Sequence, residues 1–440
     1  MYSKIEEDNT LVKSDFGLDL PLKSNGDNFH LSELMDDQRE AAIYILQAIQ
    51  KYYNRDPSFK PIRMTLMGKA GSGKTFFVKT MITAVRRMFG YRRSALVCAP
   101  TGAAAFVSGG LTIQKICGMT PHNDKEVMLS DAHKEKLVKE FFDTILLLID
   151  ERSMISLNTL GKAETSIAQS TRGGKFSNDS WGDLPVVVLI EDYMQLPSVM
   201  KGSFFLPVGP MKDRSKGSMT ALEKKGSSAF LEAGNDVMVL GTVKRQDDSE
   251  KKFKEILEEI RNDCLDEENY EYLSKFHLQG DIYTPHQINQ IEKDAMFLFT
   301  RNILVVNKNL EMLDATSSIQ NPVARIVCDY PRTKHQSGKG IKNHFSDDLP
   351  TVCLICVGAK VALSNKNFNP IWGLFNGARG TVISIAYARG KSPNNGDMPE
   401  YVIVDFPHYS GPAFWADHPT VSYMPQISNR MKIYFYFIPV

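Results

Sequence analysis

The chain has 440 residues, of which 42% are hydrophobic and 23% are charged. These fractions are typical of a globular protein and exclude a mostly disordered chain, a collagen and a coiled-coil rod. Its 52 Lys and Arg residues nearly balance its 51 Asp and Glu residues, which excludes a surface covered in positive charge but permits a local basic groove. At about 150 residues per domain, the length predicts two or three domains.

The six cysteines are too few for a disulfide scaffold and indicate a reducing compartment. Cys353 and Cys356 form one C-x-x-C inside an apolar run, and we interpret them as residues of a core strand rather than as a metal or redox site. No apolar run reaches the roughly 18 residues of a membrane span, so no membrane partner is expected. Residues 1–30 are predicted to form an N-terminal tail without the features of a signal peptide or presequence.

Apolar periodicity predicts helices and strands in alternation. A helix is expected over residues 36–53, a strand over 62–67 and a second helix from Lys74 to about Met88. Further strands are predicted at 95–99, 145–149 and 186–190. Short apolar runs that end in polar loops and alternate with helices are typical of a parallel sheet in an α/β fold. Residues 163–183 and 201–228 are predicted to be loops.

The composition changes after residue 240. We expect a charged amphipathic helix over 249–260, and after residue 349 short strands broken by Gly, Asn and Pro, as in a small β-barrel. The predicted domains are 31–240, 241–348 (including a linker over 331–348), the barrel 349–425 and a C-terminal end 426–440. The apolar residues 435–439 indicate either a strand that needs a partner or a frame-altered end.

The most specific motif is Gly68-Lys-Ala-Gly-Ser-Gly-Lys-Thr75, which matches G-x-x-x-x-G-K-[ST] between a predicted strand and a predicted helix. Such loops wrap backbone N–H groups around phosphates, and the helix N-terminus adds partial positive charge. Lys74 is predicted to reach the β- and γ-phosphates of ATP, and the Thr75 hydroxyl to bind Mg²⁺. The predicted phosphate cradle also includes Gly68, Ala70, Gly71, Ser72 and Gly73.

Two carboxylates, Asp150 and Glu151, follow the strand predicted at 145–149. Asp150 is predicted to hold Mg²⁺, and Glu151 to orient or deprotonate the attacking water. In isolation a helix cap explains this pair as well. The P-loop motif upstream favours the catalytic interpretation.

Gln195 and Arg245 are candidates for contacts with the γ-phosphate. Gln195 follows the strand predicted at 186–190 and is expected to sense the γ-phosphate, although a surface loop residue is an equal interpretation of its position alone. Arg245 is expected to stabilise charge on the transferring phosphoryl group from a second domain. An Arg–Gln pair is common by chance, so its spacing carries little weight.

Taken in order, these motifs resemble the PIF-one-type DNA helicases of superfamily one, close to the RecD branch, from about residue 34 to about 425. Residues 150–154 are similar to the family's D-E-x-S-M, and residues 99–105 to its A-P-T-G-x-A-A. The other similar segments are 35–38, 109–114, 195–197, 245–246, 300–309, 357–361 and 375–380.

The resemblance implies a P-loop NTPase of the α/β class. It has a RecA-like parallel-sheet domain, a second, incomplete RecA-like domain and a small SH3-like β-barrel insertion, with ATP between the RecA-like domains. It further implies that Gln38 reads adenine and that a separate group of residues contacts single-stranded DNA. That group is Pro100, Thr101, Gly102 and Gln114.

The function implied is that of an ATP-dependent DNA helicase. Such an enzyme couples ATP hydrolysis to five-prime to three-prime movement along single-stranded DNA and to duplex unwinding. Its partners are single-stranded DNA and DNA duplex junctions, and its role is genome maintenance, covering DNA repair, recombination and telomere maintenance. We expect a monomer in the nucleus and/or the mitochondrion.

Several positions depart from the family pattern. Glu191 replaces a Gly and is expected to repel a nearby triphosphate, Ser198 replaces a Pro, and Gln114 replaces a His. Two motifs that normally follow the barrel, K-S-Q-G and one with a second Arg, are not found. An alternative is therefore a truncated paralogue or mobile-element fragment that binds ATP and single-stranded DNA without unwinding. A P-loop ATPase acting on protein leaves D-E-x-S-M and A-P-T-G-x-A-A unexplained.

Overall fold

The computed structural model describes residues 29–119, 131–170, 180–182, 184–195, 197–198, 220–243, 250–277, 283–327, 345–346, 349–350, 352–364, 369–413, 420–425 and 434–436. The chain divides into two compact units, Met1–Leu265 and Asp266–Val440. Within the described ranges, none of the helices combines the length and the apolar character that crossing a membrane requires.

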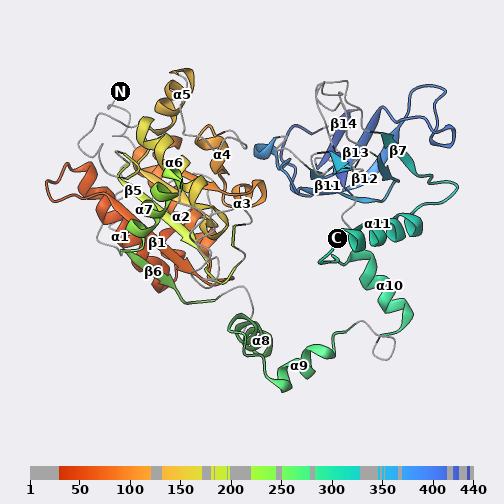
Figure 1. Ribbon diagram of the computed structural model, residues 1–440, viewed down its shortest axis with the longest axis horizontal. Coiled ribbons are helices and arrows are strands. Elements are labelled where there is room, and N and C mark those ends of the chain that lie inside the picture. The colour runs from red at the N-terminus through yellow and green to blue at the C-terminus, as the bar shows by residue number, and fades with distance from the viewer. Residues whose placement is uncertain are drawn as a thin grey trace. The chain divides into compact units, whose positions relative to one another are not determined.

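A six-stranded parallel sheet forms the centre of the first unit (Figure 1), with the strand order β3-β2-β4-β5-β1-β6. Every pair of neighbouring strands in it is parallel. The strands are β1 (Ile62–Gly68), β2 (Ala95–Ala99), β3 (Leu111–Thr112), β4 (Leu146–Ile149), β5 (Val186–Glu191) and β6 (Val237–Leu240). The predicted α/β class is confirmed, and the carboxyl ends of all six strands meet at one edge of the sheet.

Each of the two sheet faces has its own core, because successive side chains of a strand point to opposite faces. On β5, Val186, Val188 and Ile190 join one apolar cluster, whereas Val187 and Leu189 join the other. The first cluster includes helices α1 (Asp36–Tyr53) and α2 (Lys74–Phe89). The second includes α4 (Ile113–Ile116), α5 (Asp131–Phe141), α6 (Leu157–Ser170) and α7 (Ala221–Ala233).

The loops predicted at 163–183 and 201–228 are partly wrong, because α6 extends to Ser170 and α7 begins at Ala221. The two helices cross closely at two glycines. A Cβ on Gly161 would collide with the carbonyl oxygen of Leu222, and a Cβ on Gly226 with that of Leu157. This close packing stabilises two helices whose polar composition is typical of loops, since tertiary contacts override weak local propensity.

Helix α8 (Lys251–Arg261) confirms the helix predicted over 249–260 and belongs to the first unit. Its Ile256 is fully buried. The first unit ends at Leu265, whereas the sequence predicts a domain boundary near residue 240. The helix after the sheet is therefore grouped with the sheet.

The described part of the second unit begins with three helices, α9 (Glu267–Ser274), α10 (Pro285–Asp294) and α11 (Asn302–Thr316). Two antiparallel strands follow, β7 (Ala324–Val327) and β10 (Val352–Ile355). A two-residue pair, β8 (Phe345–Ser346) and β9 (Leu349–Pro350), lies between them in the chain. Cys353 and Cys356 are buried, which confirms their interpretation as core residues.

A five-stranded antiparallel sheet with the order β14-β13-β12-β11-β15 completes the second unit. Its strands are β11 (Lys360–Ser364), β12 (Arg379–Ala386), β13 (Tyr401–Asp405), β14 (Val421–Pro425) and β15 (Tyr434–Tyr436). Strand β15 pairs with β11, so residues 435 and 436 of the apolar run lie in a strand, and residues 437–439 fall outside the described residues. The SH3-like barrel and the second RecA-like domain remain predictions.

Candidate functional site

The Gly-rich segment forms a tight loop between β1 and α2. Gly71 and Gly73 have φ angles of +85° and +77°, a left-handed conformation that favours glycine. Gly73 is the N-cap of α2, so Lys74 is the first residue of the helix and Thr75 lies in its first turn. This is the strand–loop–helix arrangement that the motif predicts.

The side chain of Lys74 folds over the loop. Its Nζ donates hydrogen bonds to the carbonyl oxygens of Gly68, at 2.6 Å, and Lys69, at 3.1 Å. Burial lowers the pKa of the Lys74 ammonium, and nearby carboxylates oppose this shift. These carboxylates are Asp192, Glu151 and Asp150, and they come from the ends of two other strands.

Gln38, in the first turn of α1, contacts the same loop. It is buried, and its Nε2 donates a hydrogen bond to the carbonyl oxygen of Ser72 at 2.9 Å. Its Oε1 accepts one from the Met35 backbone N–H at 3.2 Å. Both ends of the amide are thereby fixed, and a Cβ on Gly73 would lie 2.5 Å from Nε2. The glutamine predicted to read adenine thus lies against the Gly-rich loop.

Asp150 and Glu151 follow β4, which is separated from β1 by β5 alone. Asp150 is buried and accepts hydrogen bonds from the Ser108 hydroxyl and, at 3.0 Å, from the Glu151 backbone N–H. Burial raises the pKa of both carboxyls. Glu151 has a φ of +50°, and its Oε2 is buried without a hydrogen-bond partner in the described part of the chain. A non-glycine residue such as Glu151 in this strained backbone conformation is typical of functional sites.

Arg152, the next residue, is buried and pairs with Glu191, with 3.5 Å between Nη1 and Oε2. Its guanidinium carbon lies 3.6 Å from the ring centre of Phe230 on α7. Following the alternation along β5, Glu191 points to the face of α7, opposite to the face of α2. The repulsion expected between Glu191 and a phosphate is therefore not supported, because its side chain faces Arg152.

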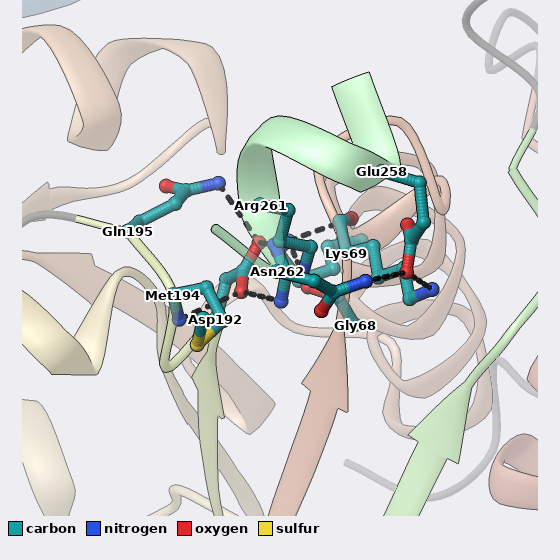
Figure 2. A network of polar contacts seen from close by, with 9 residues as sticks. Gly68, Lys69, Asp192, Met194, Gln195, Glu258, Arg261 and Asn262 are labelled. Carbon is teal, nitrogen blue, oxygen red and sulfur yellow. Dashed lines mark hydrogen bonds and ion pairs between the residues drawn. The ribbon is translucent and has the colours of Figure 1, made fainter. Parts of the chain in front are cut away.

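Asp192 follows β5 and is the centre of a polar network (Figure 2). Its carboxylate accepts hydrogen bonds from the Met194 N–H at 3.1 Å and from Gln195 Nε2 at 3.3 Å. Arg261, the last residue of α8, donates to both of its oxygens. The sequence predicts Gln195 as a site residue but assigns no role to Asp192 or Arg261. Asp192 matches the Asp of the family's G-D-x-x-Q-L-P-P motif, and Arg261 directly follows the amphipathic pattern of residues 249–260.

The remaining predicted residues lie along the same edge of the sheet or outside the described residues. Pro100 and Thr101 follow β2, and the Thr101 hydroxyl accepts a hydrogen bond from the Ala104 N–H at 3.2 Å at the start of α3 (Gly102–Val107). Gln114 is half-buried on α4, after β3. Arg245 falls outside the described residues. Among the described residues, no cluster of His, Cys, Asp or Glu has the arrangement of a metal site.

A Gly-rich loop at the carboxyl edge of a six-stranded parallel sheet, with two carboxylates after a nearby strand, defines a P-loop protein of the RecA-like α/β class. Residues 33–270, more than half of the chain, match the family described as PIF1-like helicase. The chain belongs to the PIF1-like helicase family.

Two curated relatives come from Saccharomyces cerevisiae. The ATP-dependent DNA helicase RRM3 is 34% identical over 137 residues, 30% of this chain and 18% of the relative. The ATP-dependent DNA helicase PIF1 is 27% identical over 206 residues, 44% of this chain and 23% of the relative. The match therefore spans about a fifth of each relative's length. The crystal structure of the Pif1 helicase from Candida albicans has a TM-score of 0.57 at 21% identity, covering 89% of this chain and 77% of that one, which confirms the fold.

Proposed function

We propose that this chain is an ATP-dependent DNA helicase that couples ATP hydrolysis to movement along single-stranded DNA and to duplex unwinding in genome maintenance. The observation that carries the proposal is the convergence of Lys74, Glu151 and Asp192 at one edge of the parallel sheet. The charge of Lys74 lowers the pKa of both carboxyls, and their charges raise the pKa of Lys74. The names of both yeast relatives support the same activity.

The nucleotide is proposed to lie on the Gly-rich loop. Backbone N–H groups of residues 71–75 at the start of α2 would bind its phosphates, and Lys74 would exchange its two carbonyl contacts for the β- and γ-phosphates. Gln38 already lies against this loop, and we propose that its amide also reads the adenine edge.

The oxygen donors of this site fit Mg²⁺, which prefers hard oxygen ligands. Thr75 supplies a hydroxyl in the first turn of α2. Asp150 supplies a buried carboxylate, and the positive charge of Lys74 favours its ionised form. Bound Mg²⁺ would neutralise charge on the phosphates. We propose Thr75 and Asp150 as the residues that hold it.

Glu151 is the proposed general base. Its raised pKa makes it a better proton acceptor than an ordinary glutamate, and its buried Oε2 has no hydrogen-bond partner among the described residues. Gln195 is proposed to sense the γ-phosphate, and Arg245 to stabilise the charge on the phosphoryl group in transfer.

Single-stranded DNA is the proposed partner of the loops after β2 and β3. Pro100, Thr101, Gly102 and Gln114 would contact it, and duplex junctions would be unwound as the chain moves. The predictions of a monomer and of a location in the nucleus and/or the mitochondrion derive from the resemblance and stay predictions.

The decisive experiment measures ATP hydrolysis with and without single-stranded DNA, beside a Lys74→Ala variant. We expect DNA-stimulated turnover that the variant abolishes, followed by unwinding of a forked duplex. Binding of ATP and single-stranded DNA without stimulated turnover would favour the alternative of a binding protein that does not unwind. Turnover that persists unchanged in Lys74→Ala would refute the proposal, because it would not come from this site.

A further inference from the structure

Helix α8 reaches the proposed nucleotide site through its last residue. The guanidinium of Arg261 binds Asp192 with both terminal nitrogens, at 2.5 Å from Nη2 to Oδ1 and 3.1 Å from Nη1 to Oδ2. This fork geometry holds a carboxylate in one orientation as well as neutralising it. The Asp192 side chain is fully buried and that of Arg261 is 21% exposed, so solvent weakens the pair little.

Asp192 in turn holds the γ-phosphate sensor proposed above. Its Oδ2, which accepts from Arg261 Nη1, also accepts from Gln195 Nε2 at 3.3 Å. The carboxylate therefore lies between the guanidinium and the amide, as Figure 2 shows. A change in the position of Arg261 would therefore move the Asp192 carboxylate, and with it the acceptor of the Gln195 amide.

A second contact fixes α8 against the Gly-rich loop. Glu258 lies one turn before Arg261, on the same face of the helix, and its Oε1 accepts from Lys69 Nζ at 2.6 Å. Asn262 Nδ2 donates to the same oxygen at 3.3 Å. Together with the buried Ile256, these contacts hold α8 across both the loop before α2 and the loop after β5. The Lys69–Glu258 contact thus links α8 to the phosphate-binding loop three residues before Arg261.

We propose that Arg261 is a positioning residue for ATP hydrolysis, which acts through Asp192 to orient the amide of Gln195 beside the γ-phosphate. The inference rests on the proposed ATPase function and deepens it. It concerns a residue of the first unit and is independent of Arg245. Removal of Arg261 frees the Asp192 carboxylate to turn, so that the Gln195 amide loses an acceptor fixed in one orientation.

The test compares Arg261→Gln and Arg261→Lys with the wild-type chain at saturating single-stranded DNA. We expect Arg261→Gln to lower kcat by about 10- to 100-fold, because misplacing a catalytic group by about 1 Å has effects of this size. The KM for ATP should change by less than about threefold, since Arg261 is proposed to orient Gln195 and not to bind the nucleotide. Arg261→Lys should recover part of kcat, because the charge remains but the fork is lost.

A double-mutant cycle separates positioning from a merely structural role. If Arg261 acts through Asp192, then Arg261→Gln combined with Asp192→Asn should be no slower than the slower single variant. Lys251→Gln, an exposed residue at the start of α8, is the matched control and should leave kcat unchanged. Independent, multiplicative losses in the cycle, or wild-type kcat in Arg261→Gln, would overturn the inference while leaving the ATPase proposal intact. A wild-type chain without Lys74-dependent turnover would overturn both.

Discussion

Arg152 and Glu191 form an ion pair inside the first unit, with only 1% and 0% of their side chains exposed. The pair joins the residue after Glu151 to the end of the neighbouring strand β5. Phe230 of α7 covers the guanidinium from the other side. Glu191, which stands where the family has Gly, is thus neutralised by Arg152 on the face of the sheet opposite to α2.

We expect Arg152→Met to lower the free energy of unfolding by about 3–5 kcal/mol, because it leaves a buried carboxylate without its cation. Urea denaturation followed by tryptophan fluorescence measures this loss. Arg93→Met is the matched control: Arg93 pairs with Glu140 at the surface, at 3.5 Å, where an ion pair contributes less than about 1 kcal/mol. Equal losses in the two variants would contradict the argument.

Gly73→Ala should weaken ATP binding by about tenfold or more, equivalent to about 1.4 kcal/mol. The added Cβ would lie 2.5 Å from Gln38 Nε2 and displace the amide that binds the carbonyl oxygen of Ser72. Gly90→Ala is the control, because Gly90 has a similar φ of +72° but nothing within 4 Å of the added atom. Titration with a fluorescent ATP analogue measures both affinities. An affinity of Gly73→Ala equal to that of Gly90→Ala would contradict the role given to the contact with Gln38.

Gln114→Ala should weaken binding of single-stranded DNA by about 0.5–1.5 kcal/mol, the contribution of one hydrogen bond, and leave the unstimulated ATPase rate unchanged. The measurement is the concentration of single-stranded DNA that gives half-maximal stimulation, taken at one fixed salt concentration because such binding depends strongly on salt. Gln47→Ala, an exposed residue on α1, serves as the control. An unchanged half-maximal concentration would remove Gln114 from the proposed DNA contacts.

The free energy of unfolding should decrease at acidic pH as the Asp192 carboxylate becomes protonated. Burial alone would raise the pKa of this carboxyl, but hydrogen bonds from Arg261 and the Met194 N–H, with the charges of Arg261 and Lys74, hold it below its ordinary value. The unfolded chain then binds the proton more readily. The folded chain is therefore stabilised above the ordinary range of Asp, and this stabilisation is lost as the pH falls through the lowered pKa.

Arg261→Gln should reduce this acid-dependent loss, because the pKa of Asp192 then moves back toward its unfolded value. Urea denaturation at neutral and acidic pH, compared between the wild type and the variant, isolates the contribution of this carboxyl from other titrating groups. Lys251→Gln should keep the wild-type slope. A steeper loss in Arg261→Gln than in the wild type would contradict the role given to the guanidinium.

Local patterns predicted the elements that form the phosphate-binding edge. The expected helix over 36–53 and the expected strand over 95–99 agree with α1 and β2, and Lys74 begins α2 as the motif requires. These features depend on neighbours in the chain: apolar periodicity, and glycines whose φ angles permit the turn at the start of α2. The family resemblance rests on the same ordered motifs.

Polar composition misled the prediction where helices are held by distant contacts. Glu164 lies in the segment expected to be a loop, yet it is buried in α6, where it pairs with Lys225 of α7 at 2.9 Å and accepts from the Trp181 N–H at 3.3 Å. Composition records only that these residues are polar. It does not record that a second helix, some 60 positions away, supplies the partner.

The sequence by itself therefore determined the P-loop, the strand carboxylates and the family, because each depends on residues close together in the chain. The tertiary structure decided which side chains meet. The pairs Arg152–Glu191, Lys69–Glu258 and Asp192–Arg261 join residues 39, 189 and 69 positions apart. An amphipathic pattern shows that one face of α8 is covered, but the covering surface follows only from how the helix packs against the sheet edge.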